Sequence, residues 1–412
     1  MTWDPTEVWT DNPSVPQEPI RVLFVSHDAS MYGAQRTLMT LLSAIDRRVC
    51  SPFLVVPYDG PMSEAAAELG IPVFVESQVH WVPYLFMSSR RRRLGRLYRF
   101  FRTLQPRCRA IERLIADHGI DLVYTNTVTC AEGAIAARRT QKPHVWHIHE
   151  SILRNSDLAQ LLPYRLYCAA IEFLSKSIIF CSRALAMDYP QLSRKSSIVY
   201  NGLPTPPLRD RLAARRDITN ELGINHGAKL VAVVSALSPR KDHLTFLAAA
   251  EQVARRIEEV VFLIVGSGPE RIANLIRKRI GDLELDSKVR LLGWRDDIPY
   301  LLAAIDVLVI SSEQESFGLT AIEALAMETP VVATRCGGPE EAVVDGVNGL
   351  LVPVKDPRGL ADAIVRLLLD PKFARELGVN GRNHVSKQFG VDRYVQSIQR
   401  VILESAGLQR QY

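Results

Sequence analysis

Short apolar segments rich in β-branched residues alternate with longer amphipathic segments along almost the whole chain. The apolar segments have few polar interruptions, which is typical of strands buried on both faces of a parallel sheet. Helical patterns lie between them at residues 35–45, 94–115 and 161–174. The strands that we expect in the first half are Ile20–Ser26, Phe53–Val56, Val73–Glu76, Leu122–Thr125, His144–Ile148, Ile178–Cys181 and Ile198–Tyr200.

This alternation breaks at the turn-rich stretch 201–207 and then starts again. Two such blocks predict an α/β protein with two doubly wound, Rossmann-like domains, since 412 residues exceed what one core usually serves. We assign residues 20–203 and 204–390 to these domains and interpret residues 1–19 as a disordered arm. Later helices are expected at 243–256, 270–280, 319–327 and 360–369, and the strands at Leu230–Ser235, Val261–Val265, Val289–Leu292, Val307–Ile310, Val331–Ala333 and Leu350–Val352.

Composition argues against several other classes of protein. No apolar run approaches the ~20 residues of a membrane span, and the first residues do not resemble a signal peptide. The six cysteines are scattered without a Cys-x-x-Cys pair, so we expect reduced thiols, a cytoplasmic location and no zinc site. Residues 90–117 carry a local charge of +8 within a net charge of +5, which leaves −3 for the remainder. One basic element on a mildly acidic body does not suggest a nucleic-acid partner.

The loop after the expected strand 307–310 carries the most informative segment, which runs from Glu315 to Glu323. It passes through Gly318 into a helix start, whose free amides and dipole favour an anion such as a diphosphate. Glu323, one turn into the helix, is placed to accept hydrogen bonds from a ribose diol. Two structural interpretations remain open: Thr320 and Glu323 fit a capping box, and Glu315 fits a solvated loop residue.

Further motifs surround this segment in a fixed order. They are Val265-Gly-Ser-Gly-Pro269, Leu292-Gly-Trp-Arg-Asp296, Pro330-Val-Val-Ala-Thr334, Gly337-Gly-Pro-Glu-Glu341 and Asp345-Gly-Val-Asn-Gly349. Together they resemble the family-4 glycosyltransferases, retaining enzymes of the GT-B fold in which two Rossmann-like domains face each other across a cleft. The hallmark of that family is a pair of glutamates separated by seven residues, matched here by Glu315 and Glu323. The resemblance extends from Ile20 onward.

The resemblance also implies an arrangement for the end of the chain. In GT-B proteins the final helix, here 391–408, crosses back and packs on the amino-terminal domain. Its apolar positions Tyr394, Ile398, Val401 and Ile402 recur at helical spacing, so this helix needs a partner surface.

Roles for individual residues follow from the resemblance. Glu315 and His149 would be the catalytic residues beside the donor sugar, Glu323 would bind the donor ribose and Lys241 the diphosphate. His147 is expected on the opposite side of its strand from His149. Gly33 would let backbone approach the reaction centre, and the other donor-binding positions would be Gly293, Trp294 and Arg295 at the nucleobase, and Phe317, Gly318, Leu319 and Thr320 at the sugar and diphosphate.

One position departs from the family pattern. The family commonly has an arginine that contacts the diphosphate ahead of the lysine, and the matching residue here is Ala236. Either Arg240 supplies the missing charge, or phosphate binding rests on Lys241 and the helix start.

The resemblance implies a retaining glycosyltransferase with a nucleotide-sugar donor and a glycan or lipid-linked acceptor, as in cell-envelope polysaccharide synthesis. The chain lacks the Asp-x-Asp motif of metal-dependent transferases, so we expect neither a metal nor another cofactor. We also expect front-face attack, since no carboxylate is obviously placed as a nucleophile. Two alternatives stay open: an epimerase of the same fold that acts on a nucleotide sugar, and a non-catalytic scaffold.

The arginine-rich segment Arg90–Leu104 suggests a docking element. Leu94, Leu97, Tyr98, Phe101 and Leu104 recur at intervals of three and four residues, with arginines beside them. Such a helix is expected to bind an anionic membrane surface reversibly, which would make the protein peripheral on the inner face of the cell membrane. The alternatives are an ordinary surface helix whose apolar stripe faces the core, and arginines that bind a soluble acidic acceptor.

Overall fold

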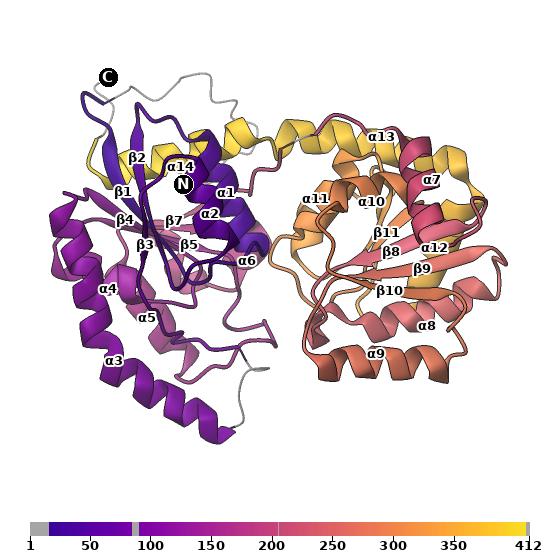
Figure 1. Cartoon of the computed structure of the whole chain (residues 1–412), viewed down its shortest axis with the longest axis horizontal. Helices are drawn as coiled ribbons and strands as arrows, with labels where there is room; N and C mark the ends of the chain where they lie inside the picture. The colour runs from indigo at the N-terminus through magenta and orange to yellow at the C-terminus, as the bar shows by residue number, and fades with distance from the viewer. Residues whose placement is uncertain (1–15, 85–89, 205, 409–412) are drawn as a thin grey trace.

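The computed structural model describes residues 16–84, 90–204 and 206–408, without the side chains of residues 90–94, 96 and 97. Two parallel sheets, each covered by helices on both faces, lie side by side (Figure 1). The prediction of two doubly wound, Rossmann-like sheets is therefore confirmed. The expected arm 1–19 falls almost entirely outside the described residues.

Within the described residues the first sheet has seven parallel strands in the order β3-β2-β1-β4-β5-β6-β7. The direction of winding reverses between β1 and β4, so the loops after these strands open at the switch point where doubly wound sheets bind ligands. The strands are β1 (Ile20–Ser26), β2 (Cys50–Val56), β3 (Val73–Val75), β4 (Leu122–Asn126), β5 (His144–Ile148), β6 (Ser177–Phe180) and β7 (Ser196–Ile198).

Helices cover both faces of this sheet because their apolar stripes pack on its buried strands. The long helix α3 projects beyond the sheet at its amino-terminal end (Figure 1). The helices are α1 (Gly33–Ala44), α2 (Pro61–Glu68), α3 (Arg90–Asp117), α4 (Glu132–Arg139), α5 (Tyr164–Leu174) and α6 (Arg183–Met187), with a 3₁₀ helix at Pro190–Lys195.

The second sheet has six parallel strands within the described residues, in the order β10-β9-β8-β11-β12-β13, and its switch point lies between β8 and β11. The strands are β8 (Lys229–Val234), β9 (Val260–Val265), β10 (Val289–Gly293), β11 (Val307–Ile310), β12 (Val331–Thr334) and β13 (Leu350–Val352). The helices are α7 (Arg211–Glu221), α8 (His243–Ala254), α9 (Glu270–Asp282), α10 (Ile298–Ala304), α11 (Leu319–Ala326), α12 (Pro357–Leu369) and α13 (Pro371–Gln388), with 3₁₀ helices at Pro239–Lys241 and Gly338–Glu341.

Every strand expected from the apolar segments is present, most of them within a residue or two of the expected bounds. Six helices were not anticipated: α2, α4, α6, α7, α10 and α13. Most of them are short, and α13 is polar on most of its surface, so their apolar periodicity is weak. Among the described residues, every helix is too short or too polar to span a bilayer.

The chain crosses between the sheets at two points that lie next to each other. After β7 it passes to the second sheet, and after α13 it returns as α14 (Val391–Ser405). The two crossing segments meet where the Leu203 amide donates to the Phe389 carbonyl at 2.8 Å. On its return, α14 packs against α1 and β5, and its buried residues complete the core of the first sheet.

Tyr394 of α14 packs closely against the crossing at Gly202. Its ring is buried, and a side chain at Gly202 would collide with it at 2.6 Å from the Tyr394 Cβ. Its hydroxyl has no hydrogen-bond partner in the described part of the chain. The ring therefore stabilises the fold by packing alone, without a contribution from the hydroxyl.

We expect Tyr394→Ala to lower the free energy of unfolding by about 3–5 kcal/mol, because it leaves a cavity between α14 and the first sheet. Tyr394→Phe should leave that free energy unchanged or raise it slightly, since it removes a buried, unpaired hydroxyl. Urea titration followed by tryptophan fluorescence measures both. A loss in Tyr394→Phe as large as that in Tyr394→Ala would show that the hydroxyl has a partner.

Candidate active site

A cavity of about 1330 Å³ lies between the two sheets, at the carboxyl ends of their strands. The loops that line it follow β1, β5, β8, β9 and β11, among others, and so include both switch points. The predicted residues that line this cavity are Gly33, His149, Arg240, Lys241, Trp294, Arg295, Glu315, Phe317, Gly318, Leu319, Thr320 and Glu323. Gly293 ends β10, directly before Trp294.

Glu315 is buried between two cations in the loop after β11. Its Oε1 accepts hydrogen bonds from Lys241 Nζ and, at 2.8 Å, from Ser312 Oγ; its Oε2 accepts from Arg240 Nη1 at 3.1 Å. Burial alone would raise the pKa of this carboxyl, but Lys241 and Arg240 outweigh it and lower the pKa to about 2. Glu315 is therefore an ionised, fixed carboxylate, and its interpretation as a solvated loop residue is wrong.

Arg240 is held by acceptors from both halves of the molecule. Its Nη1 also donates to the Gln314 carbonyl at 2.6 Å, and its Nε lies 3.4 Å from Asp157 Oδ2, in the loop between β5 and α5. Burial disfavours the charge, yet Glu315 and Asp157 raise the Arg240 pKa above its usual value. The guanidinium thus links the two sheets through Nε and Nη1, and its Nη2 has no acceptor among the described residues. Nothing in the sequence pointed to Asp157.

The start of α11 is open toward the cavity. Gly318 adopts φ +83° at the N-cap, a conformation that favours glycine, and no side chain caps the helix. The amides of Gly318, Leu319 and Thr320 have no protein acceptor among the described residues. Gly338 supports this turn by close approach, because a Cβ there would lie 2.3 Å from the Phe317 nitrogen. Free amides and the helix dipole make this end a site for an anion.

Glu323, one turn further along α11, faces the first sheet. Its side chain is 7% exposed, and Oε1 accepts a hydrogen bond from Arg36 Nη2 on α1. Burial raises the Glu323 pKa, and Arg36 opposes that shift. The capping-box interpretation is wrong, because this carboxylate bonds across the cavity instead of capping its own helix. Arg36 lies three residues after Gly33, but no sequence signal assigned it a partner 287 residues away.

His149 directly follows β5 and is held in place by Asn126 at the end of β4. Its Nε2 lies 2.9 Å from Asn126 Oδ1, and Asn126 Nδ2 donates to the Ala34 carbonyl at 3.0 Å. Burial lowers the His149 pKa to about 3, so the ring is neutral at physiological pH. The expectation that His147 lies on the opposite side was wrong: the two rings are 4.0 Å apart, because residues two apart on a strand share a face.

Trp294 and Arg295 directly follow β10 and line the cavity. Trp294 is half exposed, and its ring meets the edge of Tyr32 from α1's N-cap with centroids 6.2 Å apart. The Arg295 guanidinium pairs instead with Glu221 and Asp297. This part of the chain therefore offers a ligand an aromatic face and backbone groups, but little of the arginine charge.

Several buried histidines predict a pH dependence of stability. Burial lowers the pKa of His27, His144 and His149 to about 3 and of His243 to about 4, and places that of His147 well below its usual range. Unfolded histidine titrates near 6.5, so the unfolded chain binds more protons below that pH. We expect the free energy of unfolding to fall as pH drops from 7 to 5, by up to about 1.4 kcal/mol per pH unit for each histidine.

Urea titrations at pH 5, 6 and 7 measure the slope of the free energy of unfolding against pH. His144→Gln should reduce the slope by the share of one histidine, because it removes one buried titrating ring. His226→Gln is the matched control, since His226 is exposed and its replacement removes no buried ring. A wild-type slope in His144→Gln would contradict the assignment.

Comparison with known proteins agrees with this geometry. Residues 31–205 match the family Glycosyltransferase Family 4, and residues 214–384 match the family Glycosyl transferases group 1. Two relatives are each 28% identical: an uncharacterized glycosyltransferase of Methanocaldococcus jannaschii over 71% of this chain, and the UDP-Gal:alpha-D-GlcNAc-diphosphoundecaprenol alpha-1,3-galactosyltransferase of Escherichia coli over 72%. Both matches span 78% of the relative.

A third relative matches over a shorter stretch. The N-acetyl-alpha-D-glucosaminyl L-malate synthase of Bacillus anthracis is 31% identical over 47% of this chain, and the chain spans 50% of that relative. Among solved structures, Anabaena HepE in complex with UDP-glucose superposes with a TM-score of 0.78 and 25% identity, over 93% of this chain and 100% of that one. Sucrose-phosphate synthase from Thermosynechococcus elongatus shares the fold, with a TM-score of 0.74 and 20% identity over 95% and 100% of the two chains. The chain belongs to the family-4, group-1 glycosyltransferases and has the GT-B fold.

Proposed function

We propose that this protein transfers a sugar from a UDP-sugar donor to a glycan or lipid-linked acceptor, with retention of anomeric configuration and without a metal ion. The observation that carries the proposal is the grouping of Glu315, Lys241, Glu323 and the open start of α11 around one cavity. The choice of UDP is supported by the E. coli relative, named for a UDP-galactose donor, and by Anabaena HepE with bound UDP-glucose.

The cavity offers a separate position for each part of such a donor. Glu323 has Oε2 free of protein donors among the described residues and can accept hydrogen bonds from the ribose diol. The open amides of α11 and the ammonium of Lys241 suit the diphosphate. Glu315 and the neutral ring of His149 then lie beside the sugar, and Trp294 beside the base.

The state of Glu315 supports front-face attack. During transfer the bond between the anomeric carbon and the diphosphate oxygen breaks, and the acceptor oxygen bonds to that carbon on the same face. The acceptor's proton then passes to the departing diphosphate. Glu315, ionised and held by two cations, is a poor nucleophile but stabilises positive charge on the sugar ring. Lys241 and the start of α11 offset the negative charge on the leaving group, which is the role that a metal ion has in other transferases.

We further propose that the first half of the molecule docks on an anionic membrane surface through α3. Tyr98 and Phe101 on this helix are 66% and 57% exposed, whereas Phe100 faces the core. The alternative in which the whole apolar stripe is buried is therefore wrong for these two rings. The side chains of Leu94, Leu97 and the first arginines lie outside the described residues, as do residues 85–87 of the preceding loop.

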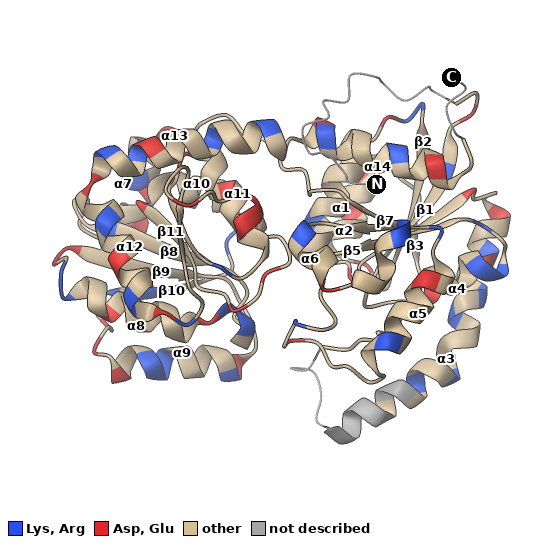
Figure 2. Ribbon diagram, turned by 180° about the vertical axis from the view of Figure 1, so that it is seen from behind, with Lys and Arg blue, Asp and Glu red and all other residues tan. Residues whose placement is uncertain are grey.

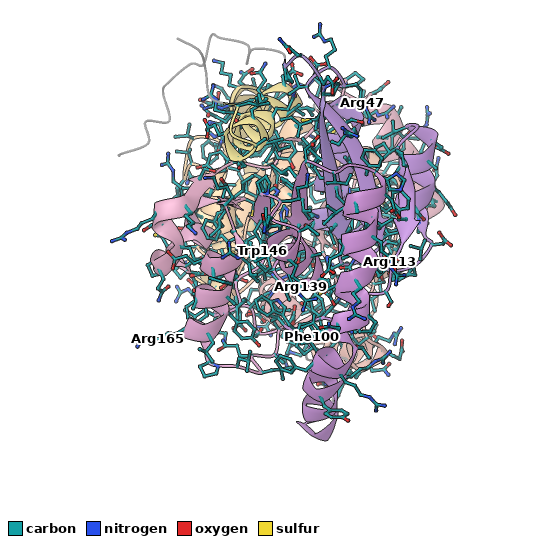
Figure 3. All side chains as sticks on the ribbon, turned by 90° about the vertical axis from the view of Figure 1, so that its left-hand side faces the viewer. Arg47, Phe100, Arg113, Arg139, Trp146 and Arg165 are labelled. Atoms are coloured by element: carbon teal, nitrogen blue, oxygen red, sulfur yellow. The ribbon has the colours of Figure 1, made fainter. Side chains whose placement is uncertain are left out.

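Helix α4 packs against both α3 and α5, and α5 also carries exposed apolar side chains. Leu166 and Phe173 on α5 are exposed, and the Arg138 guanidinium lies 4.7 Å from the centre of the Phe173 ring. Basic residues recur along the exposed parts of α3 (Figure 2), and Figure 3 shows Arg165 of α5 to the left of Arg113 of α3. Exposed aromatic rings among arginines suit reversible binding to anionic lipid, at ~1 kcal/mol for each arginine near the leaflet. A lipid-linked acceptor would then enter from this side.

Donor turnover and binding test the proposed chemistry. We expect the protein to release UDP from a UDP-sugar in the presence of EDTA and to be stabilised against heat by UDP more than by GDP or ADP. Glu323→Gln should weaken donor binding about tenfold or more and change turnover little, because the ribose contact is present throughout the reaction. Glu315→Gln should lower turnover about a hundredfold and change donor affinity little, since its charge acts in the transition state.

Isothermal titration with UDP and steady-state kinetics separate these two effects. Glutamine preserves side-chain shape, and thermal unfolding confirms that both variants fold. Equal losses of turnover in both variants, with unchanged donor affinity, would refute the assigned roles. A UDP-sugar converted to its epimer, with no transfer to an acceptor, would favour the epimerase, and no turnover of any donor would favour the scaffold.

Sedimentation with lipid vesicles tests the docking surface. We expect binding that rises with the anionic lipid content and weakens in high salt. The double variant with Tyr98→Ser and Phe101→Ser should bind at least tenfold more weakly, because it loses two rings that would enter the interface. The matched control replaces Leu212 and Leu369, two exposed leucines on the second half, by serine. Binding that ignores lipid charge and salt, or equal losses in both double variants, would rule out this surface.

A further inference from the structure

The first turn of α1 touches the expected donor site of the opposite half at several points. The Tyr32 ring meets Trp294, Arg36 bonds to Glu323, and a Cβ added at Gly33 would lie 3.4 Å from Leu319 Cδ1. Tyr32 and Arg36 are one turn apart and joined by a backbone hydrogen bond of 2.8 Å. The same turn thus reaches the residues that we assign to the base, the diphosphate and the ribose.

Two helix starts face each other across this part of the cavity. Neither α1 nor α11 has a side-chain cap or an acidic residue in its first turn. Gly33 and Leu319, the first residues of these helices, are in near contact. The positive ends of both dipoles therefore point toward the same region, which favours an anion more strongly than one helix start would.

Most cations around the cavity are already committed to protein acceptors. Arg240 bonds to Glu315, Asp157 and the Gln314 carbonyl. Arg295 pairs with Glu221 and Asp297. Arg295 uses all three of its guanidinium nitrogens in these pairs, and Arg240 uses Nε and Nη1, so turning either group toward a phosphate would disturb bonds to paired carboxylates. Arg240, considered above as the replacement for the missing arginine, therefore keeps only the N–H groups of Nη2 for that role.

Arg36 differs from both of them. Its side chain is 43% exposed and lines the cavity, and within the described residues Glu323 is the one acceptor of its guanidinium. A guanidinium has five N–H donors, so Arg36 can keep its bond to Glu323 and still donate to a second anion. The position at which the family resemblance expects an arginine, Ala236, lines the same cavity with an exposed methyl group.

We infer that Arg36 binds the donor diphosphate from the opposite half of the molecule, in place of the arginine that is missing at Ala236. This inference rests on the proposed UDP-sugar donor. Arg36 would hold Glu323 and a phosphate oxygen together, so that one side chain connects the ribose and diphosphate positions. Because Arg36 lies on α1 in the first half and Glu323 on α11 in the second, the bound diphosphate would also hold the two halves together.

Isothermal titration of Arg36→Ala with UDP and with uridine tests the inference. We expect the affinity for UDP to fall at least tenfold and that for uridine to change less than threefold, because uridine lacks the phosphates. Arg36→Lys should lose less UDP affinity than Arg36→Ala, since it keeps the charge. Arg48→Ala is the matched control: Arg48 is an exposed, ion-paired arginine outside the cavity and should have no effect.

A rescue variant makes the test more specific. Ala236→Arg in the Arg36→Ala background should restore UDP affinity to within about threefold of the wild type, because it returns the charge to the position that the family uses. Failure of this rescue would show that Arg36 does not replace that arginine.

The remaining outcomes are equally decisive. Equal losses for UDP and uridine would show that Arg36 only orients Glu323, and unchanged UDP affinity would show that it does not contact the phosphates; either result overturns the inference and leaves the proposed donor intact. A wild-type protein that binds no UDP would overturn the proposed donor as well.

Discussion

The buried carboxylate of Glu315, held between Lys241 and Arg240, is the interaction on which the rest of the cavity depends. An ionised group at this depth needs compensation from nearby cations and donors, and the adjacent Arg240 and Lys241 provide it together with Ser312 from the loop after β11. The same cations fix the loop after β11 in front of the start of α11. Arg240 also pairs with Asp157, and this ion pair connects the loop after β11 to the first half. Local charge compensation and the relative placement of the two sheets are thus parts of one network.

Much of the fold could be predicted from the sequence because parallel strands buried on both faces leave an uninterrupted apolar pattern. The segments at β1, β5, β11 and β13 show this most clearly, since their observed bounds equal the expected ones. Helix α13 escaped prediction for the opposite reason: few of its residues are buried, so the apolar signal is weak. The hydrophobic period of a segment depends on neighbouring residues alone. A single sequence therefore reveals an element only where burial makes that period strong.

The candidate site was predictable where residues close in sequence form a motif and not where distant residues meet. The loop from Glu315 to Glu323 is continuous, and the family resemblance placed its residues around the cavity. The partners of these residues lie elsewhere: Arg36 is 287 residues from Glu323, and Asp157 is 83 from Arg240. No periodicity encodes such contacts, because they depend on how two independently wound sheets come together. The same limit explains why Arg240 could be considered for the phosphate before its acceptors were known.

The return of α14 to the first sheet has a consequence for how the chain acquires its structure. One core cluster of the second sheet draws its residues only from the stretch 231–377, whereas a core cluster of the first sheet contains Tyr394, Ile398 and Ile402 from beyond the second sheet. During synthesis the first sheet emerges early but stays partly uncovered until α14 has left the ribosome. Its apolar face is exposed to solvent and to chaperones throughout that interval, a stage at which such surfaces tend to aggregate. The half that is made first is therefore the half that completes its folding last.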